Sequence, residues 1–169
     1  MKSIPQNILA LDLGTATGWA ILNRDGAIAC GTETFHSGKR SHPGQRWATF
    51  RAWLNRTIEN SQVHAIAYED VKRHLGTDAA HAYGAFRALL ELVAASHNVQ
   101  LLPVGVGTIK KTWTGRGNAD KEAMLAEALR RGFKPDTDNA ADALAILSWA
   151  TLQDATPSLT NSSPQEKNL

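Results

Sequence analysis

The chain has 169 residues, of which 43% are hydrophobic and 20% charged, and its formal net charge is +2. This balance is typical of one globular domain with a substantial core, and no apolar run approaches the roughly 20 residues that a transmembrane helix needs. The single cysteine, Cys30, excludes an internal disulfide and a zinc site built from several cysteines. We therefore expect a cytoplasmic protein with no membrane partner.

The first half of the chain predicts several strands and one helix. Short turns separate the first three strand patterns, which favours an antiparallel meander. Apolar residues at helical spacing follow a loop rich in glycine and proline. The elements expected here are strands at 7–14, 18–23 and 26–35, a loop at 36–44, a helix at 45–60 and a strand at 64–70.

The second half predicts helices around one further strand, with Thr77 or Asp78 as the N-cap of the first helix. The expected helices are 77–98, 107–113, 119–132 and 138–153, and the strand is 99–106. Residues 154–169 are polar and contain two prolines, so we expect one domain at 1–153 and a disordered tail. The pattern predicts an α/β fold: a mixed five-stranded sheet, with three antiparallel strands and then parallel strands, flanked by helices.

Three acids fall at positions where the predicted elements would bring them together. Asp12 ends the first strand, Glu69 ends the fourth, and Asp142 lies in the first turns of the last helix. Each acid alone has an ordinary structural explanation, such as a turn or a helix dipole. Together they would repel and their pKa values would rise unless a cation neutralised them. Oxygen ligands suit Mg²⁺ or Mn²⁺, and two such ions can hydrolyse a phosphodiester.

Basic residues gather in two stretches of the sequence. Each stretch alone is typical of a solvated face, but two of them beside a carboxylate site favour a ligand with a phosphate backbone. The first stretch contains Lys39, Arg40, Arg46, Arg51 and Arg56 without an acid, and the second contains Lys110, Lys111, Arg116 and Lys121.

Four segments resemble, in order and spacing, the RuvC family of Holliday-junction endonucleases, which belongs to the ribonuclease H-like superfamily. They are "ILALDLGTATGWAIL", "AYED", "GTIKKTWTGRGNADKEAM" and "TDNAADALAIL", and the resemblance covers residues 7–150. The stretch "YEDVKRHLGTDAAHAYG" is similar to the phage-encoded branch of the family. The resemblance implies a homodimer that resolves four-way DNA junctions in a bacterial cell, encoded by a phage or prophage, with two Mg²⁺ ions per site that Mn²⁺ can replace.

The resemblance also implies roles for individual residues. Asp12, Glu69 and Asp142 match the family's metal ligands, and Lys110 and Lys121 match two lysines that support catalysis near the scissile phosphate. The basic residues expected to bind flanking phosphates are Lys39, Arg40, Arg46, Lys72, Arg73, Lys111 and Arg116.

The sequence departs from bacterial members at two places. A fourth acid is expected three residues before Asp142, but Asn139 stands there and the nearest acid is Asp138. Positions three and four residues apart share a helix face, so either Asn139 or Asp138 could reach the metal site. Asp138 could be the fourth ligand, the N-cap of the helix or both. Lys72 replaces an aromatic residue that engages bases at the junction centre, so no sequence preference is carried over.

Several alternatives stay open at this point. A flap or fork nuclease of looser selectivity and a non-catalytic junction-binding protein both fit the same residues. An actin-like ATPase, suggested by "DLGTATG", would need a second phosphate loop that the sequence lacks. Trp113 could stack on a base or be buried, and His74 and His81 could be solvated or could approach the metals.

Overall fold

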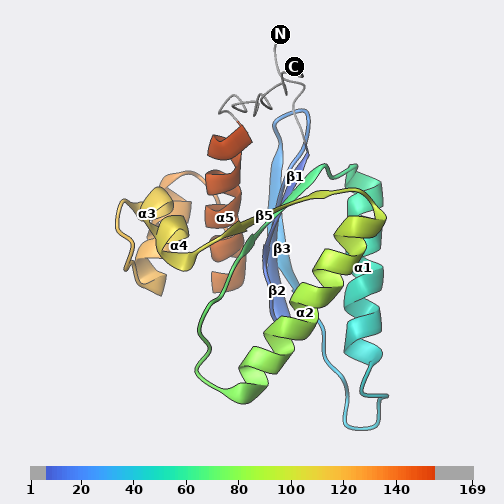
Figure 1. Ribbon diagram of the computed structural model, residues 1–169. Helices are drawn as coiled ribbons and strands as arrows, with labels where there is room; N and C mark the ends of the chain where they lie inside the picture. The colour runs from blue at the N-terminus through green and yellow to red at the C-terminus, as the bar shows by residue number, and fades with distance from the viewer. Residues whose placement is uncertain (1–6, 155–169) are drawn as a thin grey trace, which may run out of the picture.

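A computed structural model describes residues 7–154, and Figure 1 shows one sheet with helices packed on both of its faces. The strands are β1 (Ile8–Asp12), β2 (Ala16–Leu22), β3 (Ile28–Thr34), β4 (Ala65–Glu69) and β5 (Gln100–Val104). The helices are α1 (Gln45–Ser61), α2 (Thr77–Ser96), α3 (Val106–Thr114), α4 (Lys121–Arg130) and α5 (Asp138–Asp154). Every predicted element is present, and no boundary differs from the prediction by more than two residues.

The sheet has the predicted mixed topology, with the strand order β3-β2-β1-β4-β5. Strand β2 runs antiparallel to β1 and β3, whereas β4 runs parallel to β1 and β5. Leu11 pairs with Tyr68 across the parallel strands β1 and β4. The next residues, Asp12 and Glu69, therefore lie side by side where the two strands end. The expected adjacency of these two strands is confirmed.

Alternation along the strands divides the core into two layers. Leu9, Leu11 and Tyr68 pack on one face with α1 and α2, while Ala10 and Ala67 pack on the other face with α5. Successive side chains of a strand point to opposite faces. Asp12 and Glu69 therefore share the α5 face with the alanines two positions before them.

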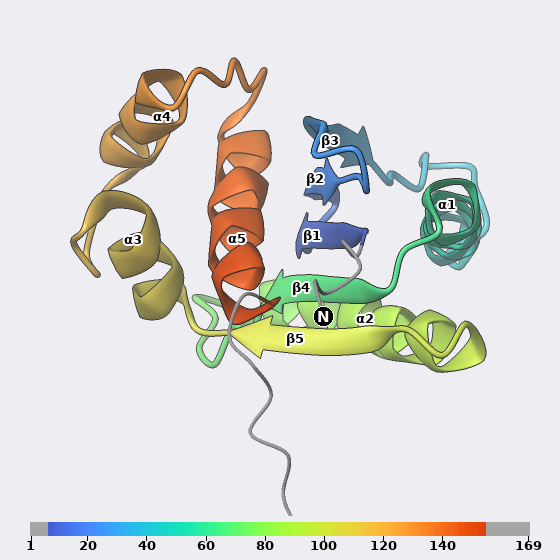
Figure 2. The same ribbon diagram turned by 90° about the horizontal axis from the view of Figure 1, so that it is seen from above.

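Helix α5 lies directly on the sheet, and α3 and α4 form an outer layer over it, as Figure 2 shows from above. A helix covered on both sides must be apolar around most of its circumference. Its fully buried residues are mainly small, which lets it approach the sheet closely; they are Ala140, Ala141, Ala143, Leu144, Ala145, Ile146, Leu147 and Ala150.

Two details differ from the sequence-based expectations. The N-cap of α2 is Gly76, which makes no side-chain capping bond, so the predicted cap at Thr77 or Asp78 is wrong and both residues lie in the first helical turn. Helix α5 continues through Asp154, and residues 155–169 of the predicted tail lie outside the described residues. Between residues 7 and 154, no helix is both long and apolar enough to cross a bilayer.

Candidate active site

Three carboxylates from separate segments come within electrostatic reach of one another where β1 and β4 end. Burial raises the pKa of Asp12 to about 8, and repulsion from Asp142 and Glu69 contributes to that rise. Burial also raises the pKa values of Glu69 and Asp142, and Asp142 adds repulsion at Glu69. These half-buried acids resist ionisation, so the folded chain holds a site that favours a positive charge.

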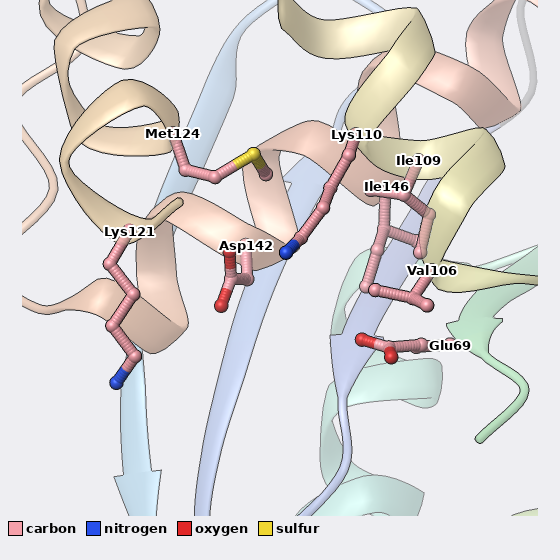
Figure 3. A pocket seen from close by; sticks show the side chains of 8 residues that line it. All are labelled: Glu69, Val106, Ile109, Lys110, Lys121, Met124, Asp142 and Ile146. Carbon is pink, nitrogen blue, oxygen red and sulfur yellow. The ribbon is translucent and has the colours of Figure 1, made fainter. Parts of the chain in front are cut away.

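Lys110 and Lys121 complete the site from the outer helical layer. Together with Glu69 and Asp142 they line a cavity of about 190 Å³, in which Figure 3 shows the two lysines reaching down from α3 and α4. Lys110 lowers the pKa values of both Glu69 and Asp142, while Lys121 lowers those of Asp12 and Asp142. The structure thus brings all six predicted catalytic residues into one electrostatic group, because Asp138 acts on Asp142 and pairs with Lys121.

Asp138 lies at the rim of this group and does not cap α5. The hydroxyl of Thr137 accepts the amide hydrogen of Ala140 at 3.0 Å, which is the capping bond, and it also bonds to Thr32 on β3. The side chain of Asp138 is 52% exposed and pairs with Lys121 at 3.5 Å. The negative charge of Asp138 repels that of Asp142 and raises the pKa of Asp142. Thr137 therefore caps α5. The role of Asp138 as a metal ligand stays a prediction.

Trp113 is buried, so its indole is part of the core and is not available for stacking on a base. Its indole N–H donates to the carbonyl of Met124 at 3.0 Å. The guanidinium of Arg131 lies 4.0 Å from the Trp113 ring and donates to the Trp113 carbonyl at 2.9 Å. These contacts hold α3 against α4 and thereby fix the spacing of Lys110 and Lys121.

The donor set fits a divalent cation. Its ligands are oxygens only, which suits Mg²⁺ or Mn²⁺, and a cation would relieve the repulsion that raises the three pKa values. Among residues 7–154, no three acidic, histidine or cysteine side chains are already gathered around one point.

Five of the seven predicted DNA-binding residues come from the segments around the starts of α1 and α2, while Lys111 lies on α3 and Arg116 in the loop after it. In Figure 1 the segments before α1 and before α2 both lie at the end where β1 and β4 finish. Lys72 pairs with Asp70, and the guanidinium of Arg46 covers the Trp47 ring at 4.1 Å. The remaining members are exposed: Lys39, Arg40, Arg73, Lys111 and Arg116.

The two histidines have different surroundings. The ring of His74 lies 4.9 Å from that of Tyr83, and His81 is exposed on α2. Neither imidazole contributes to the raised pKa values of the three central acids. A role of either histidine at the metals stays a prediction.

Sequence reasoning missed several residues that build the site. Gly18 packs against the main chain of Asn139, and Tyr83 bonds to the main chain on both sides of Asp70. Gly18 had a signal, because it closes the motif that begins at Asp12. Tyr83 had none, since its partners are backbone groups.

Comparison with known proteins identifies the family. The model of the crossover junction endodeoxyribonuclease RuvC family matches residues 8–148. The RuvC of Parvibaculum lavamentivorans is 33% identical over 145 residues, covering 82% of each chain, and that of Chloroflexus aggregans is 30% identical over 146 residues, covering 82% of this chain and 88% of the relative.

Solved structures show the same fold. The RuvC of T. thermophilus, solved in complex with a Holliday junction substrate, superposes with a TM-score of 0.74 at 20% identity, covering 90% of this chain and 99% of that one. The yeast mitochondrial Holliday junction resolvase has a TM-score of 0.63 at 15% identity, and the match covers 89% of this chain and 81% of that one. With its family model, its curated relatives and its fold in agreement, the chain belongs to the crossover junction endodeoxyribonuclease RuvC family.

Proposed function

We propose that this protein resolves four-way DNA junctions, using Asp12, Glu69 and Asp142 to hold two Mg²⁺ ions that Mn²⁺ can replace. The observation that carries the proposal is the convergence of these three carboxylates, from two strands and a helix, beside Lys110 and Lys121. Membership in a family of divalent-metal-dependent crossover junction endonucleases supports it.

Each side chain has a distinct task in this proposal. The three carboxylates hold the ions, and Asp138 supplies the fourth carboxylate from the rim. When bound, the ions activate the attacking water and stabilise the leaving oxygen of the phosphodiester. Lys110 and Lys121 are compact cations that stabilise the charge developing on the scissile phosphate. The sheet and α5 keep the carboxylates in place as that charge changes.

The DNA on either side of the cut is held through its phosphates. The proposed contacts are Lys39, Arg40, Arg46, Lys72, Arg73, Lys111 and Arg116. The first five come from segments at the end where β1 and β4 finish, and the last two come from α3, which carries Lys110, and the loop after it. Two such sites in a homodimer would cut two symmetrically placed strands of one junction. Bacterial relatives support action in the cytoplasm of a bacterial cell, with a phage or prophage gene as the proposed source.

Removal of one central carboxylate tests the catalytic assignment. Asp12→Asn and Asp142→Asn should each abolish cleavage of a synthetic four-way junction in Mg²⁺ while junction binding in a gel-shift assay is retained. Glu59→Gln, an exposed carboxylate on α1, is the matched control and should cleave normally. Full cleavage by either aspartate variant would refute the assignment.

A substrate panel tests the choice of DNA. The wild-type protein should cut a four-way junction faster than a fork, a flap or plain duplex under the same conditions. Equal rates on forks and flaps would favour a less selective branch nuclease. Because Asn139 stands where an acid was expected, a non-catalytic binding protein is the second candidate. Junction binding without cleavage in both Mg²⁺ and Mn²⁺ would select it.

A further inference from the structure

Glu69 is the last residue of β4, so the regular hydrogen bonds of the sheet stop beside it. Its register partner in β5 is Val104, and the amide of Asp70 donates to the Val104 carbonyl at 2.8 Å. Beyond that bond, the chain leaves the sheet and enters the segment 70–76 before α2. Contacts other than the hydrogen bonds between strands must therefore hold the main chain that follows Glu69.

Tyr83 of α2 provides that support. Its hydroxyl donates to the Glu69 carbonyl at 2.7 Å and accepts the amide hydrogen of Val71 at 3.2 Å. The two bonds bracket Asp70 and close the first turn after the strand. The Tyr83 ring is only 9% exposed and packs in the core beneath α2, so the hydroxyl is held by a rigid anchor.

Arg87, one helical turn beyond Tyr83, holds the same segment by a second contact. Its guanidinium donates to the carboxylate of Asp70 at 2.9 Å, and Asp70 also pairs with Lys72. The His74 ring lies 4.9 Å from the Tyr83 ring, so the tyrosine also contacts the later part of the segment. Helix α2 therefore contacts the main chain and the side chains of the residues that follow Glu69.

We propose that Tyr83 is a positioning residue, which aims the Glu69 carboxylate at Asp12 and Asp142 by fixing the main chain on both sides of Asp70. The proposal rests on the assignment of Glu69 to the metal site made above. Tyr83 acts only through Glu69, because its hydroxyl bonds to main-chain atoms and not to the carboxylate. A displacement of about 1 Å at a reacting group can cost roughly a hundredfold in rate, so a loosened turn should affect catalysis.

Tyr83→Phe is the decisive variant, since it keeps the buried ring and removes only the hydroxyl. The matched control is Tyr68→Phe, which removes a hydroxyl from the residue adjacent to Glu69 whose side chain packs on the opposite face of the sheet. We expect Tyr83→Phe to lower kcat on the four-way junction about tenfold with little change in KM, and Tyr68→Phe to leave both constants near the wild-type values.

A metal-binding measurement separates this proposal from the proposed function. Calorimetric titration of the protein alone with Mn²⁺ should give a severalfold weaker affinity for Tyr83→Phe than for the wild type or Tyr68→Phe. This readout keeps its meaning even if the wild-type protein fails to cut junctions. A structural role alone would lower the melting temperature and leave kcat and Mn²⁺ affinity unchanged well below that temperature. Wild-type kcat and Mn²⁺ affinity in Tyr83→Phe would overturn the proposal.

Discussion

Gly18 lies directly against the main chain of Asn139, so close that a Cβ atom on Gly18 would sit 1.9 Å from the Asn139 carbonyl oxygen. Gly18 is also the register partner of Asp12 across β1 and β2. The missing side chain therefore lets the first turn of α5 rest on the sheet beside Asp12. This contact sets how near Asp142 can come to the two acids of the strands.

Gly18→Ala should disable the site. The neighbouring atoms are backbone, so the clash can be relieved only by moving α5 away from β2, and a shift of about 1 Å predicts a loss of roughly a hundredfold or more in junction cleavage. The melting temperature should fall as well. Gly105→Ala is the matched control, because nothing lies within 4 Å of its added Cβ. Cleavage by Gly18→Ala at the wild-type rate would contradict this account.

The start of α5 offers a test that separates capping from catalysis. Thr137→Val removes the capping hydroxyl and should lower the free energy of unfolding by about 1 kcal/mol, while Thr137→Ser should retain it. Asp138→Asn should change stability by only about 0.5 kcal/mol or less, because the side chain is exposed and its pair with Lys121 is solvated.

Cleavage rates complete that test. If Asp138 is the fourth carboxylate, Asp138→Asn should lower junction cleavage far more than it lowers stability. Chemical denaturation and cleavage assays on the same three variants measure both quantities. A large loss of stability in Asp138→Asn with an unchanged rate of junction cleavage would show that Asp138 has a purely structural role.

The strand pattern was sufficient to predict how Asp12 and Glu69 meet. Both acids end buried strands. Because side chains of a strand alternate between its two faces, each acid lies on the face that packs against α5. The helix start was harder to predict, because Thr137 and Asp138 are adjacent and both residue types make good caps. Local sequence favours neither residue, whereas in the fold Thr137 makes the capping bond and also contacts Thr32 on a distant strand.

Other parts of the site depend on contacts that leave no trace in the sequence pattern. Trp113 lies between basic residues, as a base-stacking side chain would, yet it is buried between α3 and α4. Tyr83 follows a helical period like any core residue, and its bonds are to backbone groups 12 and 14 residues away. Such roles appear only when the packing of whole elements is known.

The pair of Asp70 and Lys72 should restrain DNA binding. Lys72 holds the pKa of Asp70 below its usual range, and the ion pair partly neutralises one positive charge beside the site. Asp70→Asn should release Lys72 for a phosphate and tighten junction binding roughly threefold at low salt, with a steeper salt dependence.

Glu91→Gln is the control for that measurement, because Glu91 shares the partner Arg87 but lies further along α2. Gel-shift titrations in EDTA, which prevents cleavage, give the affinities. The difference between Asp70→Asn and wild type should vanish at high salt, where charge contacts are screened. Weaker binding by Asp70→Asn at low salt would show that Asp70 mainly orders the segment.

Glu127 should stabilise the outer helical layer in a pH-dependent way. Arg130 and Arg131 hold the pKa of Glu127 at about 2, and Arg131 in turn contacts Trp113. A carboxyl whose pKa is lowered by folding adds stability above its unfolded pKa and loses it as pH falls towards the folded value. Glu127→Gln should therefore melt below the wild type at neutral pH, and the two curves should meet near pH 2.

Asp12 should have the opposite effect to Glu127: it should make the metal-free protein less stable as pH rises. Folding raises the pKa of Asp12 from 3.8 to about 8, so between these values the folded chain keeps a proton that the unfolded chain has released. Stability in EDTA should thus decline from about pH 4 to about pH 8. Asp12→Asn removes this cost and should melt above the wild type, by a larger margin at about pH 8.5 than at about pH 5.

A divalent cation should reverse that difference. Mg²⁺ or Mn²⁺ that binds only the folded chain raises its melting temperature by mass action, and the gain should be large in the wild type and small in Asp12→Asn. Thermal melts of both proteins at the two pH values, with and without metal, give all the comparisons, and Glu59→Gln again controls for the loss of one charge. An Asp12→Asn protein that melts below the wild type at both pH values in EDTA would mean that the carboxyl of Asp12 is stabilised by its surroundings, and the case for a cation at this site would lose its main physical support.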